Sequence, residues 1–352
     1  MMRAIELGRL GMNNTSPNPR VGCVIVKNKK VIGEGYHTRF GGPHAETEAI
    51  ESASAGVKDA TMYVTLEPCS HQGKTPPCTE RIIKEGISKV VIGIEDPDPV
   101  VSGIGRLKES GIEVICGIME EEARELIRDY VEYQVNKKPF VTVKAALSWD
   151  GKIATKDGES RWVSGSQSRD FTMRLRGEND AILAGAGTVN KDDPELTYRM
   201  TEPAAKNPLR IVIDPRLSID PGTKIIGENT VVFTQYDSDP EKIRMFADKN
   251  TDIVKAPCKN GRIDTTCVLD YLYERKMISL LVEGGGDTIG NFIDDGNVNR
   301  IIYIYAPIII GGRDAPTACD GTGISSLKKA LRLSGIKRFE IGSDIVMQGD
   351  IG

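Results

Sequence analysis

The 352-residue sequence lacks the features of a membrane protein and of a protein that binds polyanions. Its most apolar run, residues 301–310, contains Pro307, and a membrane-spanning helix needs about 20 residues. Lysine and arginine number 46 and aspartate and glutamate 50, so a net charge of −4 provides no broad basic surface. The N-terminal residues contain no apolar signal core. We therefore expect no export, no membrane partner and no nucleic-acid partner.

Cysteine usage and composition favour a cytoplasmic globular protein. Seven cysteines form an odd set spread over a long chain, which suits a reducing compartment in which some thiols bind a metal. Hydrophobic residues make up 39% and charged residues 27%, as in ordinary folded domains. The length predicts about two domains.

The sequence contains no tandem repeat, and short β-branched runs alternate with helix-like stretches, which predicts an α/β protein. The segment 136–139, Asn-Lys-Lys-Pro, interrupts this pattern, so we place a domain boundary there. Before it, we predict helices at 2–10, 43–54, 77–86 and 120–134, and strands at 21–26, 31–35, 62–66, 89–94 and 113–118. After it, we predict strands at 140–147, 180–184, 209–213, 230–234, 279–282 and 300–305, and helices at 166–176, 264–275 and after Gly286.

One histidine and two cysteines in the first half have the pattern of a catalytic zinc site. His44, Cys69 and Cys78 offer three ligands and leave the fourth tetrahedral position for water. His44 and Cys78 lie where helices are predicted to begin, and a helix N-terminus favours thiolate over thiol, so we expect both cysteines to be ionised. Zinc lowers the pKa of bound water from about 15.7 to about 7.

Glu46 lies two positions beyond His44, where a carboxylate can take a proton from the activated water and pass it to a ring nitrogen and a leaving amine. This is the pattern of zinc nucleobase deaminases, although those enzymes have two residues between the cysteines and this chain has eight. The alternatives are a structural zinc site, with His71 as the fourth ligand, or unrelated core cysteines. A structural site has no use for Glu46.

The loop between the two cysteines contains His71, Gln72, Gly73 and Lys74. A cation beside hydrogen-bond donors suits an anionic substrate group such as a phosphate. For Lys74 alone, an ordinary solvated loop is a serious alternative.

Glycine clusters in the second half suggest a dinucleotide site of unusual type. No G-x-G-x-x-G follows the opening strand, so an ordinary Rossmann domain is disfavoured. Residues 185–188 and 284–286 instead follow two other predicted strands, where glycines let backbone N–H groups approach a pyrophosphate at a helix N-terminus. Such clusters can also be simple turns.

Several longer stretches resemble the bifunctional riboflavin-biosynthesis deaminase/reductase family. They are 16–22 (SPNPRVG), 63–78 (YVTLEPCSHQGKTPPC), 96–99 (DPDP), 144–154 (KAALSWDGKIA), 282–286 (VEGGG) and Ala306-Pro307. The resemblance covers nearly the whole chain. It implies a cytidine-deaminase-like α/β/α domain at 1–138 and a dihydrofolate-reductase-like α/β domain at 139–352.

In the first domain, the resemblance implies hydrolytic deamination of 2,5-diamino-6-(5-phosphoribosylamino)pyrimidin-4-one. Zn²⁺ would be held by His44, Cys69 and Cys78, with Glu46 as the proton shuttle. Asn18 would help to seat the substrate, and His71 and Lys74 would meet its phosphate. Glu48 stands where many relatives carry histidine, from which we expect only a local electrostatic change.

In the second domain, the resemblance implies NADPH-dependent reduction of the ribosyl group to ribityl by hydride delivery at C1′. Asp150, Lys152 and Glu283 are candidates for the acid, and none stands out. The implied cofactor-binding residues are Ala146, Lys152, Trp162, Thr188, Asp192, Gly285, Gly286, Asp287, Thr288, Ile289, Gly290 and Asn291. The implied substrate-binding residues are Ser160, Arg176, Leu196, Arg199 and Glu283.

Two alternatives remain at this stage. One is a deaminase/reductase fusion with another substrate, such as a different phosphorylated pyrimidine, a nucleoside or a tRNA, although a tRNA would require a basic face. The other is a non-catalytic zinc-stabilised protein with a ligand-binding domain. We also expect a homo-oligomer formed through the reductase domain, with residues 301–310 as a buried or interface strand. The sequence alone leaves the order of the two reactions open.

Overall fold

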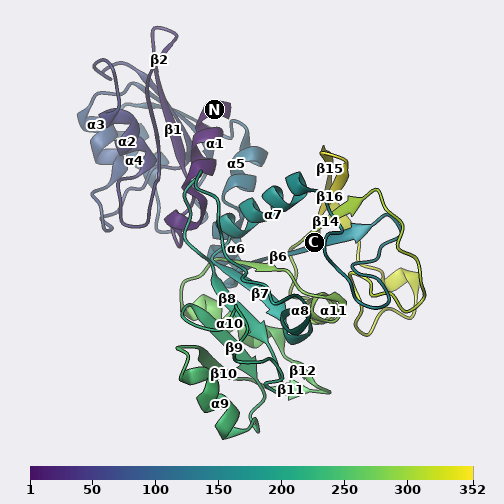
Figure 1. Cartoon of the computed structure of the whole chain (residues 1–352). Coiled ribbons are helices and arrows are strands. Elements are labelled where there is room, and N and C mark those ends of the chain that lie inside the picture. Colours follow the sequence, from purple (N-terminus) through teal and green to yellow (C-terminus); the bar gives the residue numbers. More distant parts are fainter. Residues whose placement is uncertain (352) are drawn as a thin grey trace. The chain divides into compact units, whose positions relative to one another are not determined.

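A computed structural model describes residues 1–351 (Figure 1). The chain divides into two compact units. Unit 1 comprises Met1–Lys138 together with Glu202–Ala205, and unit 2 comprises Pro139–Thr201 and the residues from Lys206 onward. No helix in the described part of the chain is long and apolar enough to cross a membrane.

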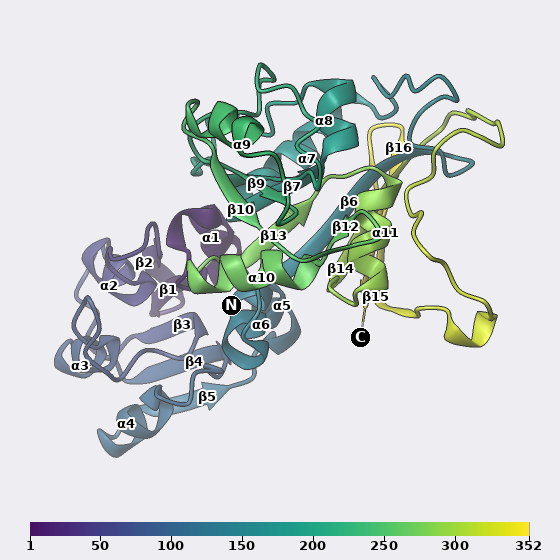
Figure 2. The same cartoon turned by 90° about the horizontal axis from the view of Figure 1, so that it is seen from below.

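Unit 1 contains a five-stranded sheet in the order β2-β1-β3-β4-β5. Strands β1 (Gly22–Lys27) and β2 (Lys30–Tyr36) form an antiparallel hairpin, and β1 also pairs antiparallel with β3 (Thr61–Leu66). Strands β3, β4 (Lys89–Ile94) and β5 (Glu113–Cys116) are parallel and lie side by side (Figure 2). The carboxyl ends of the parallel strands therefore meet at one edge, where α/β proteins commonly place their ligands.

Two layers of helices cover this sheet. Helices α2 (Ala45–Glu51), α3 (Cys78–Lys84) and α4 (Gly103–Glu109) pack in succession, and α1 (Met2–Gly8) packs against α5 (Glu120–Leu126). The resulting α/β/α sandwich has a core that includes Ile25, Met62, Ile82 and Ile92.

Three local features of unit 1 differ from the prediction. The first helix ends at Gly8, and a 3₁₀ segment (Arg9–Thr15), kinked at Met12, replaces its last predicted residues. The single helix predicted over 120–134 is two helices, α5 and α6 (Arg128–Asn136), because the backbone leaves the helical region at Ile127. Helix α4 was not predicted, since Gly103 and Gly105 weaken the helical signal in its first turn.

Unit 2 contains a nine-stranded sheet in the order β10-β9-β8-β7-β13-β6-β14-β16-β15. Its strands are β6 (Phe140–Ser148), β7 (Ala181–Gly185), β8 (Leu209–Ile213), β9 (Thr230–Thr234), β10 (Asp252–Lys255), β13 (Ser279–Val282), β14 (Arg300–Ala306), β15 (Leu333–Ile341) and β16 (Asp344–Ile351). All adjacent strands are parallel except β14–β16 and β16–β15. A short hairpin, β11 (Cys258–Lys259) and β12 (Arg262–Ile263), lies outside this sheet.

Helices α7 (Ser166–Glu178), α8 (Ala186–Asp192), α9 (Pro240–Ala247), α10 (Thr265–Glu274) and α11 (Gly286–Asp294) complete unit 2, with a 3₁₀ turn at Leu327–Lys329. Side chains alternate between the two faces of the sheet, as the period of a strand requires. On β6, for example, Val141, Val143, Ala145 and Leu147 enter one core, whereas Lys144 lies between them in sequence and faces the opposite side.

The predicted strand over 301–310 is only partly right. Strand β14 ends at Ala306, immediately before Pro307, and lies inside the sheet between β6 and β16. Ile308 and Ile309 follow it and are exposed. The elements α8, α9, β10, β11, β12, β15 and β16 were not predicted.

Candidate active sites

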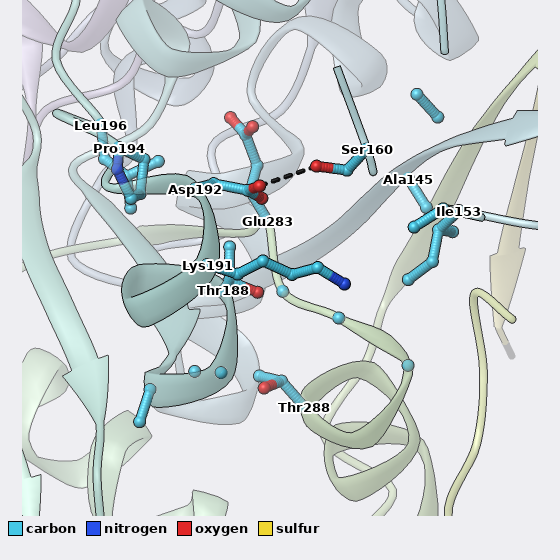
Figure 3. Close-up of a pocket in the computed structure, with 18 of the residues that line it drawn as sticks. Ala145, Ile153, Ser160, Thr188, Lys191, Asp192, Pro194, Leu196, Glu283 and Thr288 are labelled. Carbon is cyan, nitrogen blue, oxygen red and sulfur yellow. Dashed lines mark hydrogen bonds between the residues drawn. The ribbon is translucent and has the colours of Figure 1, made fainter. Parts of the chain in front are cut away.

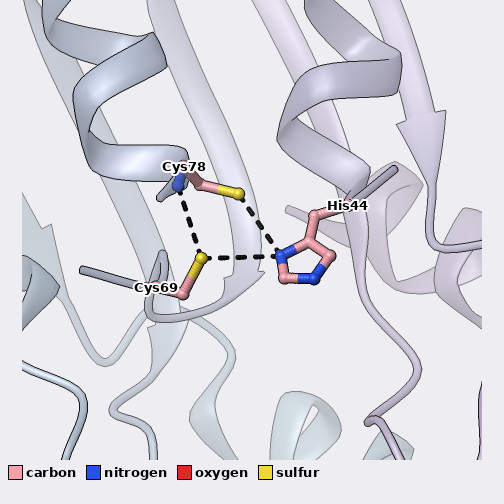
Figure 4. A group of neighbouring side chains, drawn as sticks. All are labelled: His44, Cys69 and Cys78. Carbon is pink, nitrogen blue, oxygen red and sulfur yellow. Dashed lines mark hydrogen bonds between the residues drawn. The ribbon is translucent and has the colours of Figure 1, made fainter. Parts of the chain in front are cut away.

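His44, Cys69 and Cys78 converge at one point in unit 1, with their ligand atoms all within 4.8 Å of one another (Figure 4). The Nδ1 atom of His44 lies 3.6 Å from the Cys69 sulfur and 3.4 Å from the Cys78 sulfur. His44 is the extended residue that caps α2, Cys69 follows β3, and Cys78 opens α3 after Pro77. Two helix starts and one strand end therefore bring the three side chains together.

The spacing of these atoms fits a tetrahedral zinc ion. Zn–S bonds of about 2.3 Å and Zn–N bonds of about 2.0–2.1 Å at tetrahedral angles separate a sulfur from a nitrogen ligand by about 3.6 Å. The two observed S···N distances match that value. The donor set of one imidazole and two thiols leaves one position for water or substrate, as in catalytic zinc sites.

The two thiols differ in acidity. A hydrogen bond from Cys78, followed by the contact with His44, lowers the pKa of Cys69 to about 4. The same pairing with Cys69, together with burial, raises the pKa of Cys78 well above its usual range. The two sulfurs therefore share a single proton, and a bound divalent cation would stabilise the second thiolate. That both cysteines are ionised when they hold zinc stays a prediction.

Glu46 lies in the first turn of α2 and is almost fully buried. Burial raises the pKa of its carboxyl group, although the nearby His44 opposes that shift. A carboxylate that holds a proton more readily than usual is suited to proton transfer near neutral pH. Glu48, by contrast, packs over Gly35 of β2.

A buried histidine that we did not predict as a site residue, His37, lies beside the cluster. Its ring meets that of His44 edge-on, with centroids 5.2 Å apart. The Nδ1 atom lies 2.8 Å from the Pro43 carbonyl oxygen, to which it donates, so Nε2 is free to accept from Asn18 Nδ2 at 3.3 Å. Asn18 is thereby fixed close to the metal ligands. The only signal in the sequence was a histidine directly after a strand.

The loop between the two cysteines leaves His71 and Lys74 exposed. The Lys74 ammonium lies 3.9 Å from the centroid of the Phe40 ring, a cation–π contact that orients the side chain without neutralising it. The charge remains available to an anion.

A cavity of about 820 Å³ opens in unit 2 at the carboxyl ends of β6, β7, β8 and β13 (Figure 3). Its size is within the range of small-molecule and cofactor sites. The N-termini of α8 and α11 both reach it, and Lys191 extends its side chain into it. Ser160 donates to a carboxylate oxygen of Asp192 at 2.7 Å and so ties the loop after β6 to α8.

Both halves of the chain match known families. Residues 1–94 match the model of the cytidine and deoxycytidylate deaminase zinc-binding region, and residues 139–347 match that of the RibD C-terminal domain. The riboflavin biosynthesis protein RibD of Actinobacillus pleuropneumoniae is 40% identical over 353 residues, which cover 99% of this chain and 93% of that protein. The chain belongs to the RibD family.

Other members of the RibD family agree with this assignment. RibD of Escherichia coli K12 is 36% identical, covering 99% of this chain and 97% of the relative. A Thermotoga maritima structure, described as a diaminohydroxyphosphoribosylaminopyrimidine deaminase/5-amino-6-(5-phosphoribosylamino)uracil reductase, superposes with a TM-score of 0.87 at 36% identity, covering 100% of this chain and 97% of that one. Acinetobacter baumannii RibD superposes with a TM-score of 0.85 at 32% identity, with the same coverage.

The matches confirm the family resemblance and the fold class inferred from sequence. The chain is a bifunctional enzyme of riboflavin biosynthesis, with a deaminase and a reductase domain. These domains support zinc in the first and a nicotinamide cofactor in the second.

Most residues that the RibD resemblance implied for the reductase line the cavity of unit 2. They are Ala146, Ser160, Trp162, Arg176, Thr188, Asp192, Leu196, Arg199, Glu283, Gly285, Gly286, Asp287 and Thr288. Four others are not part of its lining. Ile289, Gly290 and Asn291 are buried further along α11, where Asn291 donates to the Ile263 carbonyl oxygen. Lys152 donates instead to the Ala315 carbonyl oxygen at 2.8 Å.

The charged centre of this RibD-family cavity is Glu283, buried between two cations. Arg176 donates to its two carboxylate oxygens at 2.9 and 3.1 Å, and the Lys144 ammonium lies 3.7 Å away. Burial opposes ionisation, but Arg176 and then Lys144 hold the pKa of Glu283 at about 2. The Arg176 fork is therefore engaged by a buried carboxylate. Arg199 is also paired, with Glu195, but that pair is half exposed, so Arg199 can turn to a phosphate at less cost.

This arrangement changes the candidates for the reductase acid. Glu283 is ionised at neutral pH and cannot donate a proton there. Asp150, whose pKa is lowered to about 2, accepts hydrogen bonds from the backbone of Ile310 and Gly311 and is not part of the cavity lining. Lys144, which sequence analysis missed, lines the cavity, and burial lowers its pKa. No neighbouring residue in the sequence indicated a functional role for Lys144, because its partner Glu283 is far away in the sequence.

Proposed function

We propose that the chain deaminates 2,5-diamino-6-(5-phosphoribosylamino)pyrimidin-4-one hydrolytically and then reduces the ribosyl group of the product with NADPH. The observation that carries the proposal is the convergence of His44, Cys69 and Cys78 beside the buried Glu46, in one chain with a reductase cavity. The Thermotoga maritima relative, named for a deaminase and a reductase of phosphoribosylated pyrimidines, supports the substrate class. The same proposal places the enzyme in the cytoplasm.

In the deaminase, His44, Cys69 and Cys78 would hold zinc, which supplies a Lewis acid that activates water at neutral pH. Glu46 accepts the proton released when water attacks the ring carbon. It passes this proton to the ring nitrogen. As the carbonyl forms, it takes the remaining proton of the attacking oxygen and passes it to the departing amine, so that ammonia leaves. The raised pKa of Glu46 suits both steps.

Asn18 and the loop between the cysteines bind the rest of this substrate. Asn18 keeps hydrogen-bonding capacity next to the ring position, because its amide is oriented by His37. Lys74 and His71 meet the phosphate from the exposed loop. This assignment favours a small phosphorylated pyrimidine over an unphosphorylated nucleoside.

In the reductase, the N-termini of α8 and α11 would hold the cofactor pyrophosphate. Helix N-termini offer unpaired backbone N–H groups and a partial positive charge. Thr188 and the segment from Gly285 to Thr288 lie at these two helix starts, and Asp192 lies at the end of α8. Ala146 and Trp162 line the same cavity and would contact other parts of the cofactor. NADPH supplies the hydride for the ribosyl C1′.

The substrate end of the cavity is formed by Ser160, Leu196, Arg199 and the group around Glu283. We assign Lys144 as the proton donor that accompanies ring opening, because burial lowers its pKa and so eases loss of the proton, and because it is part of the cavity lining. Glu283 keeps Lys144 charged and positioned, and Arg176 fixes Glu283 in turn.

A coupled assay tests the two activities separately. The zinc-loaded protein receives the phosphoribosylated diaminopyrimidine with and without NADPH, and ammonia release and NADPH oxidation are followed independently. We expect ammonia without NADPH, followed by oxidation once NADPH is added. NADPH consumption without ammonia, in protein that contains zinc, would contradict deamination as the first step. If neither ammonia release nor NADPH oxidation were observed, the substrate assignment would be refuted.

Glu46→Gln distinguishes this enzyme from a zinc-stabilised ligand-binding protein. The substitution keeps the size of the side chain and removes its ability to shuttle protons. We expect unchanged zinc content and a loss of ammonia release of about 10²–10⁴-fold. A variant that releases ammonia at the wild-type rate would refute the role of Glu46.

We also propose that a second copy of the chain pairs along β15. This strand is one of the two edges of the nine-stranded sheet, and Leu333, Ile336 and Phe339 on it are exposed. A long edge strand with exposed apolar side chains is a template for pairing with another chain. We expect sedimentation velocity to show a dimer or larger assembly for the wild type and a smaller species for Ile336→Lys. A monomeric wild type would refute the assembly.

A further inference from the structure

The first turn of α6 makes one buried and one partly buried polar contact, and the two reach different loops of the deaminase unit. Arg20 and Asp129 form one, and Tyr130 and Asp96 form the other. Neither contact includes a residue assigned to the reaction above.

The first contact fixes the loop that carries Asn18. The Arg20 guanidinium donates to an Asp129 carboxylate oxygen at 2.9 Å, and both side chains are more than nine-tenths buried. Arg20 lies two residues after Asn18 and two before β1. The ion pair therefore holds the chain segment from which Asn18 reaches toward the metal cluster.

The second contact fixes the loop between β4 and α4. The Tyr130 hydroxyl donates to an Asp96 carboxylate oxygen at 3.2 Å, and the same oxygen accepts from the backbone N–H of Asp98 at 2.9 Å. Tyr130 is itself buried. One carboxylate oxygen thus joins α6 to the turn at 96–98.

This second loop lies directly against the turn that carries Cys69. The Gly103 Cα approaches the Pro68 carbonyl oxygen so closely that a Cβ there would overlap it. The backbone N–H of Ser102 donates to the Ser70 hydroxyl at 3.0 Å. The position of the 95–102 loop therefore sets the position of one wall beside the metal cluster.

Packing alone does not fix this loop. Asp96 and Pro97 border a separate cavity of about 520 Å³, which Cys116, Glu120 and Val131 also line. A loop with open space on one side depends on its hydrogen bonds for its position. Besides Tyr130, the Glu67 carboxylate supplies such bonds by accepting from the backbone of Asp96 and Ile104.

We propose that Arg20, Asp129 and Tyr130 are positioning residues of the deaminase. They set its affinity for substrate by holding two loops, the segment that carries Asn18 and residues 95–102, in place beside the metal cluster. This inference rests on the proposed deaminase function. It assigns the control of substrate KM to α6, which carries no residue of the proton-transfer chemistry.

Tyr130→Phe tests the proposal in the full-length, zinc-loaded protein, because it removes one hydroxyl and keeps the buried ring. Tyr63→Phe on β3 is the matched control, since the Tyr63 hydroxyl makes no hydrogen bond within the described residues. We expect the KM for deamination to rise about three- to tenfold in Tyr130→Phe, with kcat within about twofold of wild type. Zinc content and NADPH oxidation by the reductase should remain unchanged.

A double variant, Arg20→Met with Asp129→Leu, tests the first loop while avoiding an unpaired buried charge that could prevent folding. It should raise the deamination KM in the same way. Equal KM values for wild type, Tyr130→Phe and the folded double variant would overturn the proposal.

Hydrogen exchange measured by mass spectrometry provides a readout that needs no substrate. Tyr130→Phe should speed exchange in residues 95–102 relative to Tyr63→Phe and leave α2 and α3 unchanged. If the wild type releases no ammonia, the proposed deaminase function fails, and the exchange experiment still decides whether α6 holds the loop. Unchanged exchange in residues 95–102 would overturn the inference on its own.

Discussion

Glu283→Gln is the most informative single substitution in the reductase unit. It removes one negative charge from a largely buried group and leaves Arg176 and Lys144 facing a neutral amide. The remaining cations then lie close together in the sheet interior without their shared counter-ion. We expect a large loss of stability confined to unit 2.

The magnitude follows from the pKa of Glu283. The two cations hold it at about 2, against 4.5 for an ordinary glutamate, despite the burial that opposes ionisation. At 1.36 kcal/mol per pKa unit, the native state gains about 3 kcal/mol from the ionised form. Breaking a buried ion pair on one side costs a comparable ~3–5 kcal/mol.

The sign of the pH dependence is fixed by the lowered pKa. The contribution of Glu283 is complete above the unfolded-state value of 4.5 and is lost as the pH falls from there toward 2. The stability difference between wild type and Glu283→Gln should therefore shrink from about 3 kcal/mol at neutral pH to about 2 kcal/mol near pH 3.5.

Urea unfolding followed by tryptophan fluorescence measures this difference, because both tryptophans, Trp149 and Trp162, belong to unit 2. Glu195→Gln serves as the control, since its pair with Arg199 is half exposed and contributes about 0–1 kcal/mol. A loss below about 1 kcal/mol for Glu283→Gln, or a difference that does not change with pH, would refute the reasoning.

Three further outcomes are expected. Removing the metal with a chelator should abolish ammonia release and preserve NADPH oxidation. It should also expose Cys69 and Cys78 to alkylation, which mass spectrometry measures. Ammonia release from metal-free protein would contradict the zinc assignment. Gly185→Ala should lower the free energy of unfolding in urea by about 1–3 kcal/mol, because its new Cβ would overlap the Thr288 hydroxyl. Adding Thr288→Ala to the same chain should recover most of that stability. An equal loss in the single and the double variant would count against this packing. Lys74→Ala should raise the deamination KM for the phosphorylated substrate by about tenfold or more and should change the KM for the dephosphorylated substrate little. Phe40→Leu is the control, because it removes the ring beside Lys74 and keeps the charge. Equal effects on the two substrates would argue against a phosphate contact.

The deaminase site could be predicted from the sequence because its residues lie within short segments that carry clear local signals. His44 and Cys78 open helices marked by the preceding Pro43 and Pro77, and the start of a helix is among the clearest sequence signals. Glu46 lies in the first turn after His44, so its place near the metal ligands follows from the helix. His37 was missed because only its distant contacts, with Asn18 and Pro43, give it a role.

The reductase site depended more on the family resemblance, because its parts come from distant segments. Lys144 on β6 meets Glu283 after β13, and no sequence pattern joins them. Strand β15 was missed because its residues are exposed and do not alternate between apolar and polar. The glycine run 284–286 was predicted to contact a cofactor, but the structure adds another reason for it: the Gly286 Cα is closely approached by Asp320 and the Thr317 carbonyl oxygen.

The short segment Glu202–Ala205 has a consequence for attempts to separate the two activities. It follows Arg199 in the sequence, but it groups with unit 1, where Asn14 donates to the Ala204 carbonyl oxygen at 2.7 Å. A deaminase fragment that ends at Lys138 would lack this piece, and a reductase fragment that begins at Pro139 would carry it without Asn14. Dividing the gene between Lys138 and Pro139 would therefore damage both fragments. A reductase domain from another source could replace this one only if it kept the segment Glu202–Ala205.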